Sequence, residues 1–321
     1  ILIDKGFAYV SEGDVYFRVT KSNNYAKLAN KTLEDLEIGA SGRTDAETDR
    51  KEDPLDFALW KAAKEGEISW ESPWGPGRPG WHIECSVMAT EILGDTIDIH
   101  GGGADLEFPH HTNEIAQSEA KTGKTFANYW MHNGFVNVDN EKMSKSLGNF
   151  VTVHDMLKTV DGQVLRFFLA TQQYRKPINF TEKAIHDAEV NLKYLKNTHS
   201  LPLTEEVSQA ELQAYLDAFQ AAMDDDFNTA NGVTVLFDMA KWINSGNYDE
   251  TVKNAFEKIL QVFGIVFEEE TLDEDIEKLI EERQAARANK DFATADRIRD
   301  ELAAQGIKLL DTKEGVRWTR D

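Results

Sequence analysis

Helical and strand-like patterns of hydrophobic residues alternate in the middle of the chain. Apolar residues recur at helical spacing over residues 81–93 and again over 111–122, and a glycine follows each segment, as is typical of helix ends. Residues 96–100 and 135–138 alternate apolar and polar side chains, which predicts two short strands. Strands that alternate with helices indicate an α/β fold with a parallel sheet.

The patterns on either side differ from this centre. Up to about residue 75, a strand-like run at 15–19 mixes with polar segments and a charge-rich stretch at 45–53, which indicates a small mixed unit or an insertion. Prolines and glycines cluster between residues 73 and 80 and predict a rigid loop. Beyond residue 155, amphipathic runs predict a helical domain, at 181–199, 208–222, 229–244 and 250–263.

Composition narrows the class of protein. The chain has 321 residues, of which 41% are hydrophobic and 29% charged, so we expect a soluble globular protein with two or more domains. No run approaches the roughly 20 apolar residues of a membrane span, and the first residues lack a signal-peptide pattern. The single cysteine, Cys85, excludes an internal disulfide framework, and we expect a cytoplasmic protein.

Charge is unevenly distributed along the chain. The formal net charge of −22 argues against binding to nucleic acid through a surface that is basic overall. Residues 186–270 hold 16 acidic and 5 basic side chains, whereas residues 283–320 hold 9 basic and 6 acidic ones. A local basic face near the C-terminal end therefore remains possible.

Histidines concentrate around the only cysteine. Five of the eight lie within 51 residues: His82, His100, His110, His111 and His132. Cys85 belongs to the first predicted helix, and His110 and Glu114 are spaced i, i+4, so the last two share a helix face. Thiolate, imidazole and carboxylate together suit Zn²⁺. The alternative is a buried core cysteine beside an ordinary contact on a helix surface.

Three further features of this region have more than one possible role. His111 and Glu114, at i, i+3, could hold a metal equally well, and spacing does not choose between the two histidines. His100 ends a predicted strand, where ligands collect in open α/β sheets, and it could orient a ligand or bind metal. The glycines at 101–103 allow close approach of a nucleotide, or form a tight turn.

A second candidate for chemistry is the loop at 141–149. Lys142 and Lys145 lie three residues apart among small residues, and their ammonium groups could surround a polyphosphate. On composition alone, the segment is equally a solvated basic loop.

These segments resemble a known enzyme family. Residues 142–146 read Lys-Met-Ser-Lys-Ser, the signature of class I aminoacyl-tRNA synthetases. Together with five other segments in the same order and spacing, they resemble the cysteinyl-tRNA synthetases: residues 53–61, 77–86, 98–106, 108–114 and 224–230. The resemblance covers essentially the whole chain.

The resemblance implies a zinc site for the substrate. By analogy with the family, Cys85, His110 and Glu114 bind one zinc ion, which in turn binds the sulfur of the amino acid cysteine. Serine cannot reproduce that contact, so no editing domain is expected. Trp81 and His100 are expected to wall the amino-acid pocket, and Asp105 to pair with the substrate ammonium.

The resemblance also implies how the amino acid cysteine is activated. Lys145 is expected to bind the ATP phosphates with help from Lys142, while Gly102 and Gly103 contact the nucleotide and Mg²⁺ accompanies it. Cysteine then forms cysteinyl-adenylate and is transferred to tRNA(Cys). We expect the enzyme to be a monomer.

Two family features are absent from the sequence. No His-Ile-Gly-His signature occurs, and no second cysteine is present as a fourth zinc ligand. We therefore expect an N-terminally incomplete chain that is inactive by itself. The resemblance then implies four parts: the rest of a connective insertion (1–75), the second half of a Rossmann catalytic domain (76–180), a helical domain (181–270) and a tRNA-contacting segment (271–321).

The basic C-terminal end is the expected anticodon contact. The candidates for binding tRNA are Arg283, Arg287, Arg297, Arg299, Arg317 and Trp318. Most of these arginines have acidic neighbours within one helical turn, so solvated ion pairs are the alternative.

Two other functions compete with this one. A related ligase could use the same core to join cysteine to an amino sugar, without RNA. The absent first half also allows a non-catalytic tRNA-binding protein.

Overall fold

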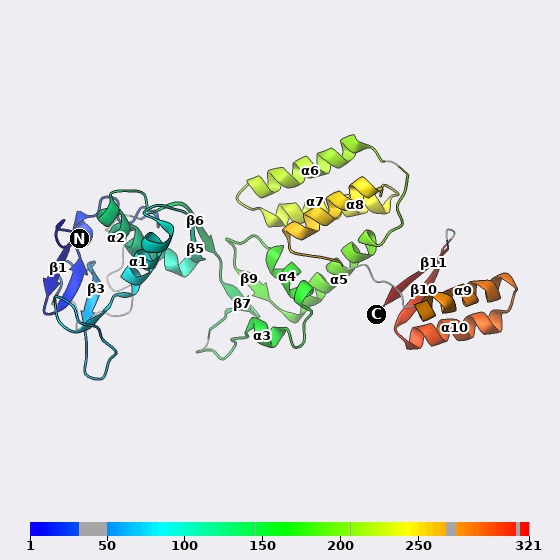
Figure 1. Ribbon diagram of the computed structural model, residues 1–321, viewed down its shortest axis with the longest axis horizontal. Coiled ribbons are helices and arrows are strands. Elements are labelled where there is room, and N and C mark those ends of the chain that lie inside the picture. Colours follow the sequence, from blue (N-terminus) through cyan, green and yellow to red (C-terminus); the bar gives the residue numbers. More distant parts are fainter. Residues whose placement is uncertain (32–49, 145, 206, 268–273, 313–314, 321) are drawn as a thin grey trace. The chain divides into compact units, whose positions relative to one another are not determined.

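A computed structural model describes residues 1–31, 50–144, 146–205, 207–267, 274–312 and 315–320 (Figure 1). The chain divides into two units, Ile1–Ile265 and Val266–Asp321. No helix among these residues has the length and apolar character needed to cross a membrane.

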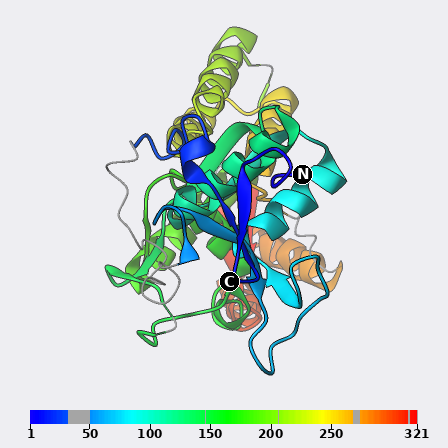
Figure 2. The same ribbon diagram turned by 90° about the vertical axis from the view of Figure 1, so that its left-hand side faces the viewer.

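The first unit begins with an antiparallel sheet. Its strands follow the order β1 (Ala8–Ser11), β2 (Asp14–Phe17), β3 (Phe57–Ala62) and β4 (Gly77–Pro79). Alternate side chains of β2 and β3 point into one apolar cluster, as expected for a sheet with one buried face. Helix α1 (Trp81–Leu93) packs against β3, on the side of the molecule seen in Figure 2.

The alternating pattern at the centre forms two parallel strands and two helices. After α1 come β5 (Ile97–Gly103), α2 (Thr112–Thr122) and β6 (Ala127–Asn133), with β5 and β6 paired in parallel. The two helices were predicted within one residue, and both end at a glycine with positive φ. The sequence pattern missed β6, whose residues show no clear alternation.

The glycines at 101–103 do not form the tight turn that we considered. They extend β5, and Gly102 pairs with His132 of β6. A Cβ atom on Gly102 would lie 2.9 Å from Cε1 of His111, so glycine is required because the histidine ring packs directly on the strand.

A second small sheet follows. Strand β7 (Val136–Val138) pairs with β8 (Glu141–Lys142) and, in parallel, with β9 (Ile178–Phe180). In the sequence, helices α3 (Val153–Met156) and α4 (Gly162–Ala170) lie between β8 and β9. Strand β8 thus forms the first two residues of the segment 141–149.

Helices make up the rest of the first unit, and the four predicted runs are confirmed. They are α5 (Glu182–His199), α6 (Gln209–Asp224), α7 (Thr229–Asn244) and α8 (Glu250–Val262). Side-chain oxygens cap the amino ends of three of them, at Thr181, Asn228 and Asp249.

The second unit is a helical pair with a hairpin. Helices α9 (Glu274–Ala288) and α10 (Phe292–Ala304) precede the antiparallel strands β10 (Ile307–Thr312) and β11 (Gly315–Arg320). Ile298, Leu302 and Ile307 are fully buried and form its core with Ile276.

Candidate active site

Cys85, His110 and Glu114 converge, as the sequence analysis expected. Cys85 lies on α1, His110 lies in the short turn just before α2, and Glu114 lies in the first turn of α2. One potential ligand atom from each residue lies within 4.8 Å of the other two. Packing of α1 against α2 therefore brings a thiol, an imidazole and a carboxylate to one point.

A second set of three residues shares the same carboxylate. His100, His111 and Glu114 also place their potential ligand atoms within 4.8 Å of one another. Nε2 of His110 lies 2.9 Å from Oε1 of Glu114, and Nε2 of His100 lies 3.1 Å from Oε2. Glu114 thus presents one oxygen to each histidine set.

Glu114 has the features of a cation ligand. It is 1% exposed, yet neither of its oxygens has a hydrogen-bond partner in good geometry among the described residues, and the same is true of Nε2 of His100. Burial opposes its ionisation, but the contacts of His100 and His110 outweigh that effect and lower the pKa of Glu114 to about 2. A buried, ionised carboxylate that has no well-aligned hydrogen bond from the described residues fits a metal ion.

Cys85 depends on such an ion for its reactivity. Burial, followed by the negative charges of Glu114 and Glu84, raises the pKa of the Cys85 thiol. Without a cation nearby it therefore stays protonated at neutral pH. A soft divalent metal is the group that would convert it to a thiolate ligand.

Two of the three candidate histidine ligands, His110 and His111, each contact a further histidine. Nδ1 of His110 lies 2.8 Å from Nδ1 of His82, and Nδ1 of His111 lies 2.8 Å from Nε2 of His132. Burial lowers the pKa of His82 and of His111 to about 4, so both rings are neutral at neutral pH. Sequence reasoning counted His82 and His132 in the cluster but gave neither a role.

Two of the three residues expected around the amino acid, Trp81 and His100, contact this cluster. Trp81 is 56% exposed, so it is not a core residue, and its indole ring stacks on His110 with 4.4 Å between ring centroids. His100 is half-buried in the middle of β5 and not at the end of the strand, where the sequence placed it, and Asp105 is exposed two residues after the glycines.

Asn149 makes two hydrogen bonds within the loop at 141–149. Oδ1 of Asn149 accepts a hydrogen bond from the backbone N–H of Ser144 at 2.8 Å, and its Nδ2 donates to the carbonyl of Lys142 at 3.3 Å. The ammonium group of Lys142 lies 3.8 Å from the ring centroid of Phe135. Lys145 lies outside the described residues. Sequence reasoning quoted Asn149 without a role.

Comparison with known proteins decides the family. Residues 1–190 match the tRNA synthetases class I (C) catalytic domain, residues 218–268 the DALR domain, and residues 269–318 the cysteinyl-tRNA ligase anticodon binding domain. The cysteine–tRNA ligase of Streptococcus agalactiae serotype V is 81% identical over 321 residues, which are 100% of this chain and 72% of that relative.

The chain belongs to the cysteine–tRNA ligase family. The ligase of Streptococcus pyogenes serotype M6 agrees, with 82% identity over 320 residues and 72% of its length covered. ATP and tRNA are therefore partners of this class I ligase, and the matched anticodon binding domain favours this reading over the amino-sugar ligase.

Solved structures support the class I fold. A putative arginyl-tRNA synthetase from Campylobacter jejuni aligns with a TM-score of 0.51 and 14% identity, covering 84% of this chain and 60% of that one. At this identity the likeness concerns the fold alone.

Most of the candidate tRNA contacts of this ligase are engaged in ion pairs. Arg283 is 5% exposed, and its guanidinium donates to both carboxylate oxygens of Asp311, at 2.9 and 3.0 Å. Arg287 also pairs with Asp311, Arg297 pairs with Glu301, and Arg299 pairs with Asp296. Arg283 thus supports the fold of the second unit and offers little surface to RNA.

The remaining two candidates lie on β11. The ring of Trp318 packs against the apolar core of the second unit. The side chain of Arg317 lies outside the described residues.

Proposed function

We propose that this cysteine–tRNA ligase chain selects its amino acid by the thiol, through a zinc ion held by Cys85, His110 and Glu114. The observation that carries the proposal is the buried Glu114 carboxylate, whose oxygens have no hydrogen-bond partner in good geometry among the described residues and lie close to a thiol and an imidazole. When bound, zinc would supply a soft Lewis acid that holds the substrate sulfur as a thiolate.

The set that contains His110 is preferred to the set that contains His111 because of sulfur. Only the first set includes Cys85, and a mixed sulfur, nitrogen and oxygen donor set suits zinc better than Mg²⁺ or Ca²⁺. His100 is then left to line the pocket, and its Nε2 lies 3.1 Å from Oε2 of Glu114.

Other residues of the site orient the amino acid. Trp81 closes one side of the pocket because its ring already lies flat on His110, and Asp105 binds the substrate ammonium. Discrimination against serine then comes from the sulfur contact, since shape alone separates such similar side chains by only about 10- to 200-fold.

The lysine loop and the glycines act on ATP. Lys142 and Lys145 bind its phosphates, Gly102 and Gly103 lie against the nucleotide, and Mg²⁺ accompanies the phosphates. A carboxylate oxygen of cysteine attacks the α-phosphorus, and the bond to pyrophosphate breaks. For Lys142 to act, its ammonium group must leave the ring of Phe135.

The second unit contacts tRNA(Cys), and the ligase acts as a monomer. Arg287, Arg297 and Arg299 are the accessible candidates for phosphate contacts, with Arg317 and Trp318 on the neighbouring strand. Ion pairs with their acidic neighbours would have to be exchanged for contacts with RNA.

Metal analysis and calorimetry test the proposed site on the 321-residue chain. We expect about one zinc per chain, binding of cysteine but not of serine to the zinc-loaded form, and loss of both on His110→Ala. The matched control is His111→Ala, which should retain zinc. Retention by His110→Ala with loss by His111→Ala would contradict the proposal and assign the ion to the second set.

A further inference from the structure

His82 is not one of the proposed zinc ligands, but it contacts one of them, His110. Both rings are buried, and their Nδ1 atoms lie 2.8 Å apart. A neutral imidazole has one N–H group and one lone pair, so at most one of these two nitrogens carries the proton of the contact. The inference that follows rests on the proposed zinc site.

The two nitrogens of His110 face different partners. Nε2 is the atom near Glu114, so it needs a free lone pair if it is to bind a cation. The ring proton must then lie on Nδ1, where it requires an acceptor, and Nδ1 of His82 is at hydrogen-bond distance. The opposite tautomer would turn an N–H group toward the metal position.

We propose that His82 is a positioning residue, which accepts the Nδ1–H of His110 and so keeps the lone pair of Nε2 directed at the metal position between Cys85 and Glu114. Partners of this kind fix the orientation and tautomer of ligating histidines, and their loss commonly weakens metal binding by about 10- to 100-fold.

The N-terminal sheet fixes the position of His82. Gly80 precedes α1 and donates its backbone N–H to the carbonyl of Leu59 at 2.8 Å. A Cβ atom on Gly80 would lie 2.1 Å from the carbonyl oxygen of Ala58, so only glycine permits this approach of the helix to β3. The ring of His82 then packs edge-on against Phe57, with 5.6 Å between centroids.

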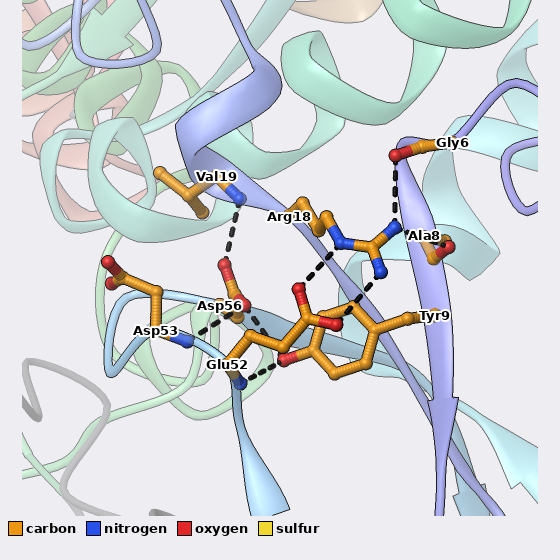
Figure 3. A network of polar contacts seen from close by, with 8 residues as sticks. All are labelled: Gly6, Ala8, Tyr9, Arg18, Val19, Glu52, Asp53 and Asp56. Carbon is orange, nitrogen blue, oxygen red and sulfur yellow. Dashed lines mark hydrogen bonds and ion pairs between the residues drawn. The ribbon is translucent and has the colours of Figure 1, made fainter.

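A polar network anchors the start of that strand (Figure 3). Asp56, the residue before Phe57, accepts hydrogen bonds from the backbone N–H of Val19 at 2.9 Å and from the hydroxyl of Tyr9 at 2.8 Å. The N-terminal sheet, β1 to β4, therefore supports the ring of His82, which in turn contacts the proposed zinc ligand His110.

The second histidine pair supplies a matched comparison. His132 contacts Nδ1 of His111 in the way that His82 contacts Nδ1 of His110, and both nitrogen–nitrogen distances are 2.8 Å. If the ion lies between Cys85, His110 and Glu114, removing His82 affects it and removing His132 does not.

The test measures zinc affinity of the 321-residue chain by competition with a chromophoric chelator. His82→Leu keeps a similar volume and removes the acceptor, whereas His82→Asn keeps an acceptor at the δ position. We expect His82→Leu to weaken binding by about 10- to 100-fold, His82→Asn to recover most of the loss, and His132→Leu to resemble the parent chain. The visible spectrum of the Co²⁺-loaded chain should change with His82→Leu and be restored with His82→Asn.

Two outcomes would overturn the inference alone. Parent-like affinity of His82→Leu would show that the tautomer needs no support, and equal weakness of His82→Leu and His82→Asn would show that His82 only fills space. A loss confined to His132→Leu would overturn the inference together with the proposed ligand set. His110→Ala tests that set separately.

Discussion

Asp56 and Glu114 are two buried carboxylates with opposite surroundings. Each is 1% exposed. Asp56 accepts hydrogen bonds from Val19, Tyr9 and Asp53, whereas neither oxygen of Glu114 has a hydrogen-bond partner in good geometry among the described residues. Protein donors thus satisfy the carboxylate of Asp56, while the described residues give the carboxylate of Glu114 no well-aligned hydrogen bond.

The pKa values of the two groups shift in opposite directions. Burial is the largest influence on both. It raises the pKa of Asp56 despite the three donors, but at Glu114 the contacts of His100 and His110 outweigh it and lower the pKa. Burial thus disfavours the charged form of Asp56, while the histidine contacts favour the charged form of Glu114.

The largest effect is expected at Glu114. Glu114→Gln removes the charge that both histidine sets share, so zinc affinity should fall by more than the roughly 100-fold that loss of a supporting residue can cause. Chelator competition measures the affinity, and Glu119→Gln on the same helix serves as the control. Unchanged affinity would remove Glu114 from the ligand set.

A smaller effect, of a different kind, is expected at Asp56. Asp56→Asn keeps one acceptor and turns an amide donor toward the donors that the second oxygen served, which should lower the free energy of unfolding by about 2 kcal/mol. Urea denaturation measures the change. Zinc affinity should change far less than in Glu114→Gln; an equal loss would erase the distinction between the two carboxylates.

The smallest effect is expected at Tyr9. Its hydroxyl donates to Asp56 at 2.8 Å and accepts from the backbone N–H of Glu52 at 2.7 Å. Tyr9→Phe should lower the free energy of unfolding by about 1 kcal/mol, because Asp56 keeps its other two donors. Tyr129→Phe, which alters an exposed ring, should change nothing measurable. A Tyr9→Phe loss as large as that of Asp56→Asn would mean that one bond carries the whole network.

Local pattern was enough to predict the helices of the site. Spacing along α1 and α2 gave their bounds, and the i, i+4 rule gave the shared face of His110 and Glu114. Spacing could not choose between His110 and His111, and the structure explains this, because each histidine belongs to a set of potential ligands that includes Glu114.

Contacts between distant segments were beyond sequence reasoning. Tyr9 and Asp56 meet across 47 residues, and His82 and His110 across 28. The ring of His111 packs directly on Gly102, nine residues earlier in the chain. Such features follow from tertiary packing, which periodicity along a chain does not encode.

The proposed ligands lie on two separate helices, and this has a consequence for the unfolded chain. Cys85 and His110 are about 25 residues apart, so an ion that joins them closes a loop and lowers the conformational entropy of the denatured ensemble. Metal binding would thus cross-link α1 to α2. Amide hydrogens in both helices should then exchange more slowly in the loaded protein, and they should slow together.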